Sequence, residues 1–323
     1  MLVTQSLPPD WRRLSFSISA DDIRLTAFIP PYRNERLLYL PLRFRLKDIL
    51  LKEVNIGGLC MNKITNLLLP KELESFRFEI EDTLLSAMII TPYKRSTTLT
   101  ESKFAGEPYI PYYQTYPKDI TGEPMRLLAQ INFAEMPPLK DFPSQGILQF
   151  FISSNIFVNA DHYHEDIFQQ FYKIRFYPTV NFEATIPRQE FLAQTADDRF
   201  PIRQELALQF QAIQEPVSAL DYRAIHCLPN LIPSSQDVDL REIYLQYFLG
   251  AGAKIGGYAY FLEEDIRHGS QLLKRYDVLL LQIDSNDEIG IMWADSGVGK
   301  FFINREKLLQ RDFSDILFQW EHY

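Results

Sequence analysis

The sequence predicts an α+β protein with mixed, mostly antiparallel sheets and a few helices, built by internal tandem duplication of a sheet-forming unit. Aromatic residues make up 14% of the 323 residues, which favours strands because planar side chains pack well on a pleated surface. Prolines number 20 and glycines only 13, which is typical of a rigid chain with many turns between strands. Similar segments also recur at a fixed spacing, the usual sign of a repeat.

The repeated segments keep the same order in both halves of the chain. At offsets of 151 or 152 residues, the matching pairs are 103–109 with 254–260, 127–131 with 279–283, and 146–152 with 297–303. One match alone would be chance, whereas three in one order at nearly one offset favour duplication. The alternative is that strand–turn–strand units look alike wherever glycine ends a loop and aromatic residues fill a core.

Each copy is expected to contain a turn, a buried strand and a second strand. Gly106 and Gly257 are expected where the backbone needs a positive φ or a close approach. The runs 127–133 and 278–283 are almost entirely apolar, which predicts central strands buried on both faces. A glycine then opens a Phe-Phe-Ile strand or its equivalent in each copy.

Helices are expected in three places. Residues 238–249 follow polar capping residues and precede Gly250, which predicts the best-defined helix. Pro201 is expected to open a second helix that continues through Phe210. A third helix is expected near the C-terminus, beginning at Asp312 or Ser314, because the apolar residues there are spaced to form one face.

The two related halves are expected to pack as one compact body with a cleft between them. The N-terminal half is 1–157, with the first repeat motif at 103–157. The C-terminal half is 158–323, with the second repeat motif at 254–323.

The chain is acidic, with a formal net charge of −9 and a pI near 5.2. A nucleic-acid-binding protein neutralises phosphates with clustered Lys and Arg, so we expect no nucleic-acid partner. The charge is uneven, at +3 over Met1–Cys60 and −12 over Phe104–Tyr323. The basic stretch 32–47 alternates with apolar residues, and we interpret it as the solvated face of a strand or hairpin.

Targeting signals and cysteine usage predict a cytoplasmic location. Cys60 and Cys227 are too few for a disulfide scaffold. Residues 1–10 lack the basic head and apolar core of a signal peptide. No apolar run approaches the ~20 residues that span a bilayer, so we expect no membrane association.

A set of motifs in the repeated region appears in a specific order. These motifs are Lys103–Pro108, Leu128–Asn132, Pro143 with Gly146–Phe151, Lys254–Gly257, Leu281–Asp284, Met292–Gly297 and Arg311–Ser314. In this order they resemble the YwqG-like proteins, a bacterial family of unknown function. Ala105 departs from the family pattern, where a second glycine is usual, and Tyr116-Pro117 stands where Trp-Pro is common. The resemblance covers roughly Lys103 to the C-terminus, matches 1–100 weakly, and implies a cytoplasmic α+β fold without an established activity.

Two glycine-rich stretches superficially suggest nucleotide binding. Residues 250–256 have the wrong spacing for a dinucleotide fingerprint and follow a predicted helix. Residues 297–300 suggest a P-loop, but Ala294 replaces its first glycine and Phe301 replaces the Ser or Thr that holds magnesium. We interpret the second stretch as a β-turn that enters a strand, and we predict no cofactor.

His162 and His164, within the segment 161–166, form the one dense group of metal-ligand types. On a strand they would share a face and could bind zinc or another divalent ion, whereas on a loop, which the composition favours, they would be solvated. The acidic run 284–288 lacks the glycine of an EF-hand loop and is interpreted as a hairpin turn. We therefore predict no metal.

Five polar residues of the repeated motifs are the candidates for ligand binding: Lys103, Gln130, Lys254, Gln282 and Asp295. The two glutamines interrupt apolar runs, and a buried amide must be hydrogen-bonded. Each glutamine either bonds the backbone of a neighbouring loop or faces a ligand. The aspartate, close to a strand end, is either a site carboxylate or a turn-capping residue.

Two functional hypotheses follow. The first is a cytosolic binding or interaction protein without catalysis, which recognises a protein or peptide in an immunity-like or regulatory role; an acidic surface could block a basic toxin enzyme. The second is a hydrolase or transferase with its site in the cleft between the two repeats. The lack of a recognisable catalytic motif favours the first hypothesis. The sequence leaves the oligomeric state open.

Overall fold

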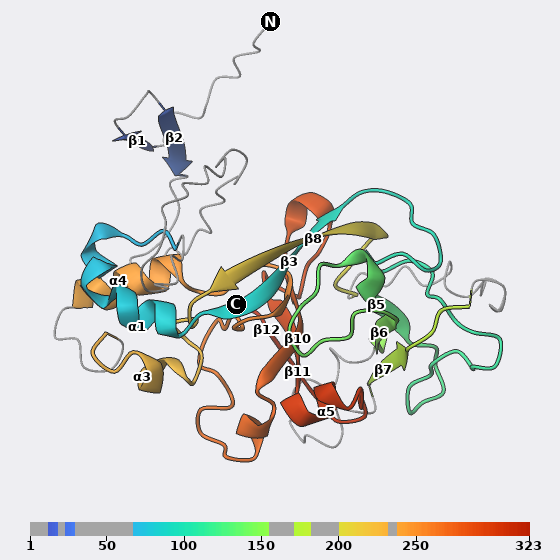
Figure 1. The fold of residues 1–323 in the computed structure, drawn as a ribbon. Coiled ribbons are helices and arrows are strands. Elements are labelled where there is room, and N and C mark those ends of the chain that lie inside the picture. Colours follow the sequence, from blue (N-terminus) through green and yellow to red (C-terminus); the bar gives the residue numbers. More distant parts are fainter. Residues whose placement is uncertain (1–11, 19–22, 30–66, 155–170, 182–199, 232–237) are drawn as a thin grey trace, which may run out of the picture. The chain divides into compact units, whose positions relative to one another are not determined.

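A computed structural model describes residues 12–18, 23–29, 67–154, 171–181, 200–231 and 238–323 (Figure 1). The chain divides into two compact units, residues 1–62 and residues 63–323. The first unit contains an antiparallel hairpin of β1 (Arg12–Ile18) and β2 (Ile23–Ile29). The basic stretch 32–47 lies outside the described residues.

The second unit is organised around one sheet of ten strands, in the order β12-β11-β10-β9-β3-β8-β4-β5-β6-β7. These strands are β3 (Leu85–Tyr93), β4 (Lys103–Phe104), β5 (Arg126–Asn132), β6 (Ile147–Ile152), β7 (Tyr172–Tyr177), β8 (Leu206–Glu215), β9 (Lys254–Gly256), β10 (Val278–Asp284), β11 (Val298–Ile303) and β12 (Ile316–Glu321). Each of the pairings between them is antiparallel.

Short helices accompany the sheet. They are α1 (Arg77–Asp82), α3 (Ala224–Cys227), α4 (Val238–Tyr247) and α5 (Arg305–Leu309), with the 3₁₀ helices η1 (Lys71–Phe76), η2 (Phe133–Glu135), η5 (Leu273–Arg275) and η6 (Asp287–Ile289). The prediction of a mostly antiparallel α+β fold with few helices is therefore confirmed. None of the helices in the described ranges has the length and apolar character needed to cross a membrane.

The strands predicted to be central lie inside the sheet. All five internal residues of β5 are buried, and the same holds for β10. Every residue of β6 and β11, the two strands that contain Phe-Phe-Ile, is also buried. Gly106 and Gly257 have φ values of +77° and +66°, as expected for the turns that follow β4 and β9.

The two long strands β3 and β8 form the centre of the sheet. They pair over nine residues, from Leu85↔Glu215 to Tyr93↔Ala207. Beyond them, β3 pairs with β9, and β8 pairs with β4. The outer strands then follow in chain order on both sides, β4 to β7 on one and β9 to β12 on the other.

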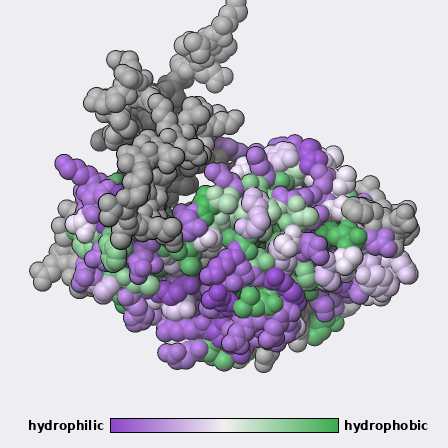
Figure 2. Space-filling view, in the orientation of Figure 1, coloured by the Kyte–Doolittle hydropathy of each residue, from purple (hydrophilic) through white to green (hydrophobic). Residues whose placement is uncertain are grey.

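The sheet is curled, and its concave side holds the main hydrophobic core. Phe150 on β6 and Phe301 on β11 are far apart in strand order, yet their ring centroids are 5.0 Å apart. Tyr172 on β7 and Phe318 on β12 approach to 5.6 Å. Aromatic side chains from both ends of the sheet thus fill the space between them. On the surface seen in Figure 2, hydrophilic residues predominate and hydrophobic ones form separate patches.

Of the three predicted helices, the one over 238–249 is confirmed as α4. Tyr244 of this helix is buried in a second cluster with Ile80 of α1, and its hydroxyl donates to the carbonyl of Val217 at 2.7 Å. The helices α1 and α4 therefore pack beside the sheet, around a small core of their own.

The helix predicted from Pro201 through Phe210 is wrong, because this region enters strand β8. Leu208 and Phe210 pack against the core while Gln209 and Gln211 are exposed, a period of two rather than 3.6. Good helix formers are overridden here by pairing with β3, which lies more than a hundred residues earlier.

The C-terminal helix is also wrong, because residues 316–321 form strand β12. Ile316 packs in the main core, whereas Leu317 packs against a separate cluster around Phe302. Adjacent side chains on opposite faces are a strand property. The helix in this region is the short α5, which begins at Arg305 after an Asn304 cap.

Candidate binding surface

Gln130, on β5, forms hydrogen bonds with the loops on both sides of β4. Its side chain is fully buried, and its Oε1 accepts a hydrogen bond from the Tyr109 backbone at 2.9 Å. Its Nε2 donates to the carbonyls of Leu99 and Glu101, both at 2.8 Å. The amide therefore joins the segment before β4 to the segment after it.

Gln282, on β10, forms the equivalent hydrogen bonds with the loops on both sides of β9. Its Oε1 accepts from the Tyr260 backbone at 2.8 Å, and its Nε2 donates to the carbonyls of Gly250 and Gly252 at 2.9 and 2.7 Å. These partners lie 151 residues after Tyr109, Leu99 and Glu101. Of the two alternatives for each glutamine, the structure shows the first: both side chains bond the backbone of neighbouring loops.

Replacing either glutamine by alanine should destabilise the protein. Each change leaves a buried amide N–H and two carbonyls without partners, which costs about 1–3 kcal/mol per unsatisfied group before relaxation. Gln130→Ala and Gln282→Ala should each lower the free energy of unfolding by at least about 2 kcal/mol in urea titrations. The exposed Gln209→Ala is the control, and equal losses in all three variants would contradict the prediction.

The two predicted lysines lie opposite the glutamines, Lys103 across from Gln130 and Lys254 across from Gln282. Both lysines are buried. Lys103 Nζ donates to the carbonyls of Thr98 and Glu107 at 2.5 and 3.0 Å, and its burial lowers its pKa. Lys254 Nζ instead forms an ion pair with Glu215, at 2.7 and 2.9 Å from the two carboxylate oxygens.

Asp295 lies apart from these pairs, exposed in the turn before β11. Its carbonyl accepts from the Tyr323 backbone at 3.0 Å. The sequence predicts a turn entering a strand at 297–300; the turn lies at 294–296, and β11 begins directly after Gly297. Gly299 is required there because a Cβ would lie 2.2 Å from the buried Trp293 ring.

The histidine cluster falls outside what the structure describes, since His162 and His164 both lie in the 155–170 gap. Within the described ranges, no group of three or more His, Cys, Asp or Glu side chains is placed to hold a metal ion.

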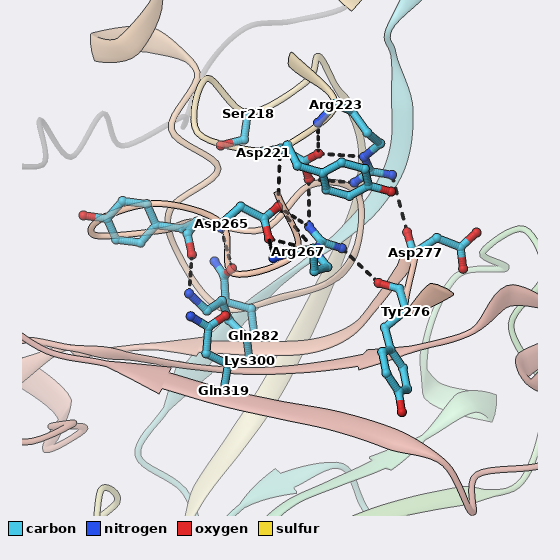
Figure 3. A network of polar contacts seen from close by, with 12 residues as sticks. Ser218, Asp221, Arg223, Asp265, Arg267, Tyr276, Asp277, Gln282, Lys300 and Gln319 are labelled. Atoms are coloured by element: carbon cyan, nitrogen blue, oxygen red, sulfur yellow. Dashed lines mark hydrogen bonds and ion pairs between the residues drawn. The ribbon is translucent and has the colours of Figure 1, made fainter. Parts of the chain in front are cut away.

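A buried ionic network lies beside β10 and β11 (Figure 3). Arg267 Nη2 is 2.8 Å from Asp265 and 3.1 Å from Asp221, and all three side chains are at most 1% exposed. Arg223 Nε donates to Asp221 at 2.7 Å. Burial opposes ionisation of Asp221, but the hydrogen bonds and charges of the two arginines outweigh it and lower its pKa. The Arg267 guanidinium also stacks 4.3 Å from the Phe302 ring centroid.

These charged residues were not among the sequence candidates. A signal exists in the repeated Asp-x-Arg spacing, at Asp221-Tyr222-Arg223 and Asp265-Ile266-Arg267. In both, the carboxylate accepts from the backbone and the guanidinium of the arginine two residues later. The network joins the loop before α3 to the loop between β9 and β10.

Lys300, on β11, is a further buried cation beside this network. Its Nζ donates to the Tyr260 carbonyl at 3.0 Å and to Glu321, and it lies 4.1 Å from the Phe261 ring centroid. Burial is the main cause that lowers its pKa, from the usual 10.5 to about 8, against the opposing effect of Glu321.

The lowered pKa of Lys300 predicts a pH effect on stability. Between about pH 8 and 10.5 the unfolded chain keeps the Lys300 proton that the folded chain has lost. The unfolded state thus binds more protons, so this residue should make the free energy of unfolding rise with pH in that window. Denaturant titrations at pH 7.5, 8.5 and 9.5, roughly spanning that window, should show a more positive slope for the wild type than for Lys300→Met. Parallel slopes would contradict the prediction.

The loop 109–125, between β4 and β5, is anchored by side-chain hydrogen bonds. The Tyr109 carbonyl accepts from Gln149 Nε2 at 2.7 Å. Asp119, a buried carboxylate, accepts from the backbones of Thr121 and Glu123 and from the Ser153 hydroxyl at 2.6 Å. Hydrogen bonds thus fix the loop at its start and near its end.

The same loop exposes aromatic side chains. Tyr112 and Tyr113 are 69% and 63% exposed, and their rings contact each other edge to face at 5.6 Å. Ile120 of the same loop is 63% exposed. On the inner side, Tyr116 packs against Phe151 of β6 at 5.9 Å. Large side chains therefore project into solvent from a loop whose backbone is anchored by hydrogen bonds.

Comparison with known proteins places the chain in one family. A family model described as a domain of unknown function (DUF1963) matches residues 102–321, more than half of the chain, so the chain belongs to this family. No curated protein matches the chain. The family region includes all ten strands of the sheet except β3, and it includes the loop 109–125.

Proposed function

We propose that this protein is a binding protein that recognises a protein or peptide partner through the loop 109–125. The observation that carries the proposal is the exposed pair Tyr112–Tyr113 on a loop fixed by buried hydrogen bonds. Tyrosine is enriched in protein interfaces because it combines a large apolar surface with a hydroxyl group.

Anchoring of the loop by hydrogen bonds supports this function. Binding costs free energy when side chains and loops must be ordered, and a loop that is already ordered avoids much of that cost. Tyr109 is bonded to side chains of β5 and β6, and Asp119 is bonded to Ser153, which directly follows β6. A partner would therefore meet a preformed surface.

Several finer points belong to the same proposal. We infer a cytoplasmic, YwqG-like bacterial protein in an immunity-like or regulatory role. We also infer that the sheet arose by tandem duplication. The matching hydrogen bonds of Gln130 and Gln282 support it, as does the interruption of regular pairing at Leu128 and at Leu280.

The alternative is a hydrolase or transferase with a site formed by both repeats. The pairs Lys103–Gln130 and Lys254–Gln282 lie on β4–β5 and β9–β10, with β3 and β8 between them. Lys103 Nζ is directed to carbonyls of the loops on both sides of β4, and Lys254 Nζ to the carboxylate of Glu215 at the end of β8. These positions favour a structural role for the four residues and, with it, the binding hypothesis.

Affinity capture with quantitative mass spectrometry tests the proposal. The bait is the full chain, compared with Tyr112→Ala/Tyr113→Ala and with the control Tyr247→Ala/Tyr323→Ala, which removes two other exposed tyrosines. We expect a protein that the wild type and the control retain and that the loop variant loses. Identical sets of captured proteins for all three baits would refute the assignment to this loop.

A further inference from the structure

Strand β7 carries two cations beside the tyrosine pair. Lys173 and Arg175 alternate along β7 and lie opposite Phe151 and Gln149 of β6, so their side chains share the face that the loop 109–125 covers. Lys173 is exposed and Arg175 is half-buried. The loop and the strand therefore meet along one row of β7.

Arg175 is held in place against the loop. Its Nη1 donates to the Thr115 carbonyl at 2.7 Å and lies 3.5 Å from the Tyr177 hydroxyl. Thr115 is two residues after Tyr113. Burial raises the pKa of Tyr177, and both Arg175 and Tyr113 lie close enough to its hydroxyl to act on that pKa as well, so the guanidinium lies near the tyrosine pair.

The two cations are not neutralised by ion pairs in the part of the chain that the structure describes. Other surface cations there, such as Arg95 and Lys307, each contact a carboxylate at 2.8 and 2.5 Å. Arg175 contacts a carbonyl and a hydroxyl instead. Among the described residues, other exposed cations such as Lys71 and Lys140 also lack a carboxylate partner, so the position of Lys173 and Arg175 beside the exposed tyrosine pair is what sets them apart.

We propose that Tyr112, Tyr113, Lys173 and Arg175 form a docking surface for an acidic peptide segment of a protein partner. Partner carboxylates would bind Arg175, whose planar guanidinium matches carboxylate geometry, and Lys173. An apolar or aromatic partner side chain would pack on the exposed tyrosine rings. This inference rests on the proposed function and specifies the chemistry of the partner.

A peptide fits this surface better than a nucleic acid. Binding to a phosphate backbone requires many cations along its path, and its affinity comes largely from them. Here two cations flank two tyrosines, and the protein as a whole would repel a polyanion. A short segment with a few carboxylates carries less charge than a polyanion, so the repulsion it meets is weaker while the same two cations remain available to it.

Peptide selection on the full chain tests the inference. A phage library of random dodecapeptides is selected on the immobilised protein, and the recovered peptides are synthesised for fluorescence anisotropy. We expect them to be rich in Asp and Glu with an aromatic or aliphatic residue. Lys173→Glu/Arg175→Glu should weaken their binding by at least about tenfold, and added salt should weaken it in the wild type.

The control is Lys71→Glu/Lys140→Glu, which makes the same charge change at two other exposed lysines and should alter affinity less than about twofold. Should the reversed variant fail to fold by circular dichroism, Lys173→Gln/Arg175→Gln replaces it, with the same expected direction.

The outcomes separate this inference from the proposed function. Peptides that are not acidic but are lost in Tyr112→Ala/Tyr113→Ala would overturn the inference and leave the binding function standing. No enrichment over an unrelated protein would count against both. A single-stranded thymidine oligonucleotide that binds as tightly as the selected peptides, and that Lys173→Glu/Arg175→Glu no longer binds, would overturn the inference and indicate a nucleic-acid ligand.

Discussion

Gly257→Ala is expected to destabilise the protein severely. Gly257 has a φ of +66°, and an L residue in the left-handed region costs roughly 1–2 kcal/mol. An added Cβ would also lie 2.0 Å from Glu215 Oε1 and 2.8 Å from Ala87 Cβ. Overpacking of this kind costs about 1–3 kcal/mol, so the total loss should reach about 3 kcal/mol or more in a denaturant titration.

The position of Glu215 explains why this clash cannot be relieved cheaply. Its carboxylate accepts from the buried Lys254 and from the Tyr258 backbone at 2.7 Å. Moving the carboxylate away from a new methyl group would leave a buried lysine without its counter-charge. Ala87 belongs to the central strand β3 and has little room to shift.

Two other glycines serve as matched controls. Gly252→Ala, at φ +98° with no neighbour within 4 Å of the new Cβ, should cost only the left-handed strain of roughly 1–2 kcal/mol. Gly106→Ala meets Glu205 at 2.4 Å, but that carboxylate bonds a backbone N–H of Thr97 rather than a lysine. We expect its loss to be intermediate. Equal losses in the three variants would show that Glu215 does not matter.

Much of the sheet was predictable because its strong signals are local. The buried strands 126–132 and 278–284 are nearly all apolar over a full strand length, and Gly106 and Gly257 mark the adjacent turns. Local patterns failed where pairing with a distant strand decides the structure. Residues 206–215 are good helix formers, and only the partner β3 makes them a strand.

The candidate surface was less predictable than the loop attachments behind it. Gln130 and Gln282 are recognisable in the sequence because a single amide inside an apolar run requires a hydrogen-bond partner. Tyr112 and Tyr113 gave no such signal, since an aromatic pair in a loop has the same composition whether it is buried or exposed. Their exposure depends on hydrogen bonds to Asp119 and Gln149 that join separate parts of the chain.

Arg267→Met should be the second change with a large effect. The substitution keeps most of the apolar side chain but removes the charge that lies between Asp265 and Asp221. Asp221 retains Arg223, whereas Asp265 keeps only backbone donors, at Tyr222 and at residue 267 itself. Removing one partner of a buried ion pair costs about 3–5 kcal/mol, so we expect a loss of that size in the free energy of unfolding.

The same reasoning predicts a partial rescue. Adding Asp265→Asn to Arg267→Met removes the uncompensated charge while keeping the acceptor for the Tyr222 backbone, so the double variant should be more stable than Arg267→Met alone. Arg305→Met is the control, because its pair with Asp141 is 48% exposed on the arginine side and should contribute less than about 1 kcal/mol. If Arg267→Met lost no more than Arg305→Met, the buried network would not stabilise the fold. If the double variant were the least stable of the set, the cost would come from lost packing against Phe302 rather than from the stranded carboxylate.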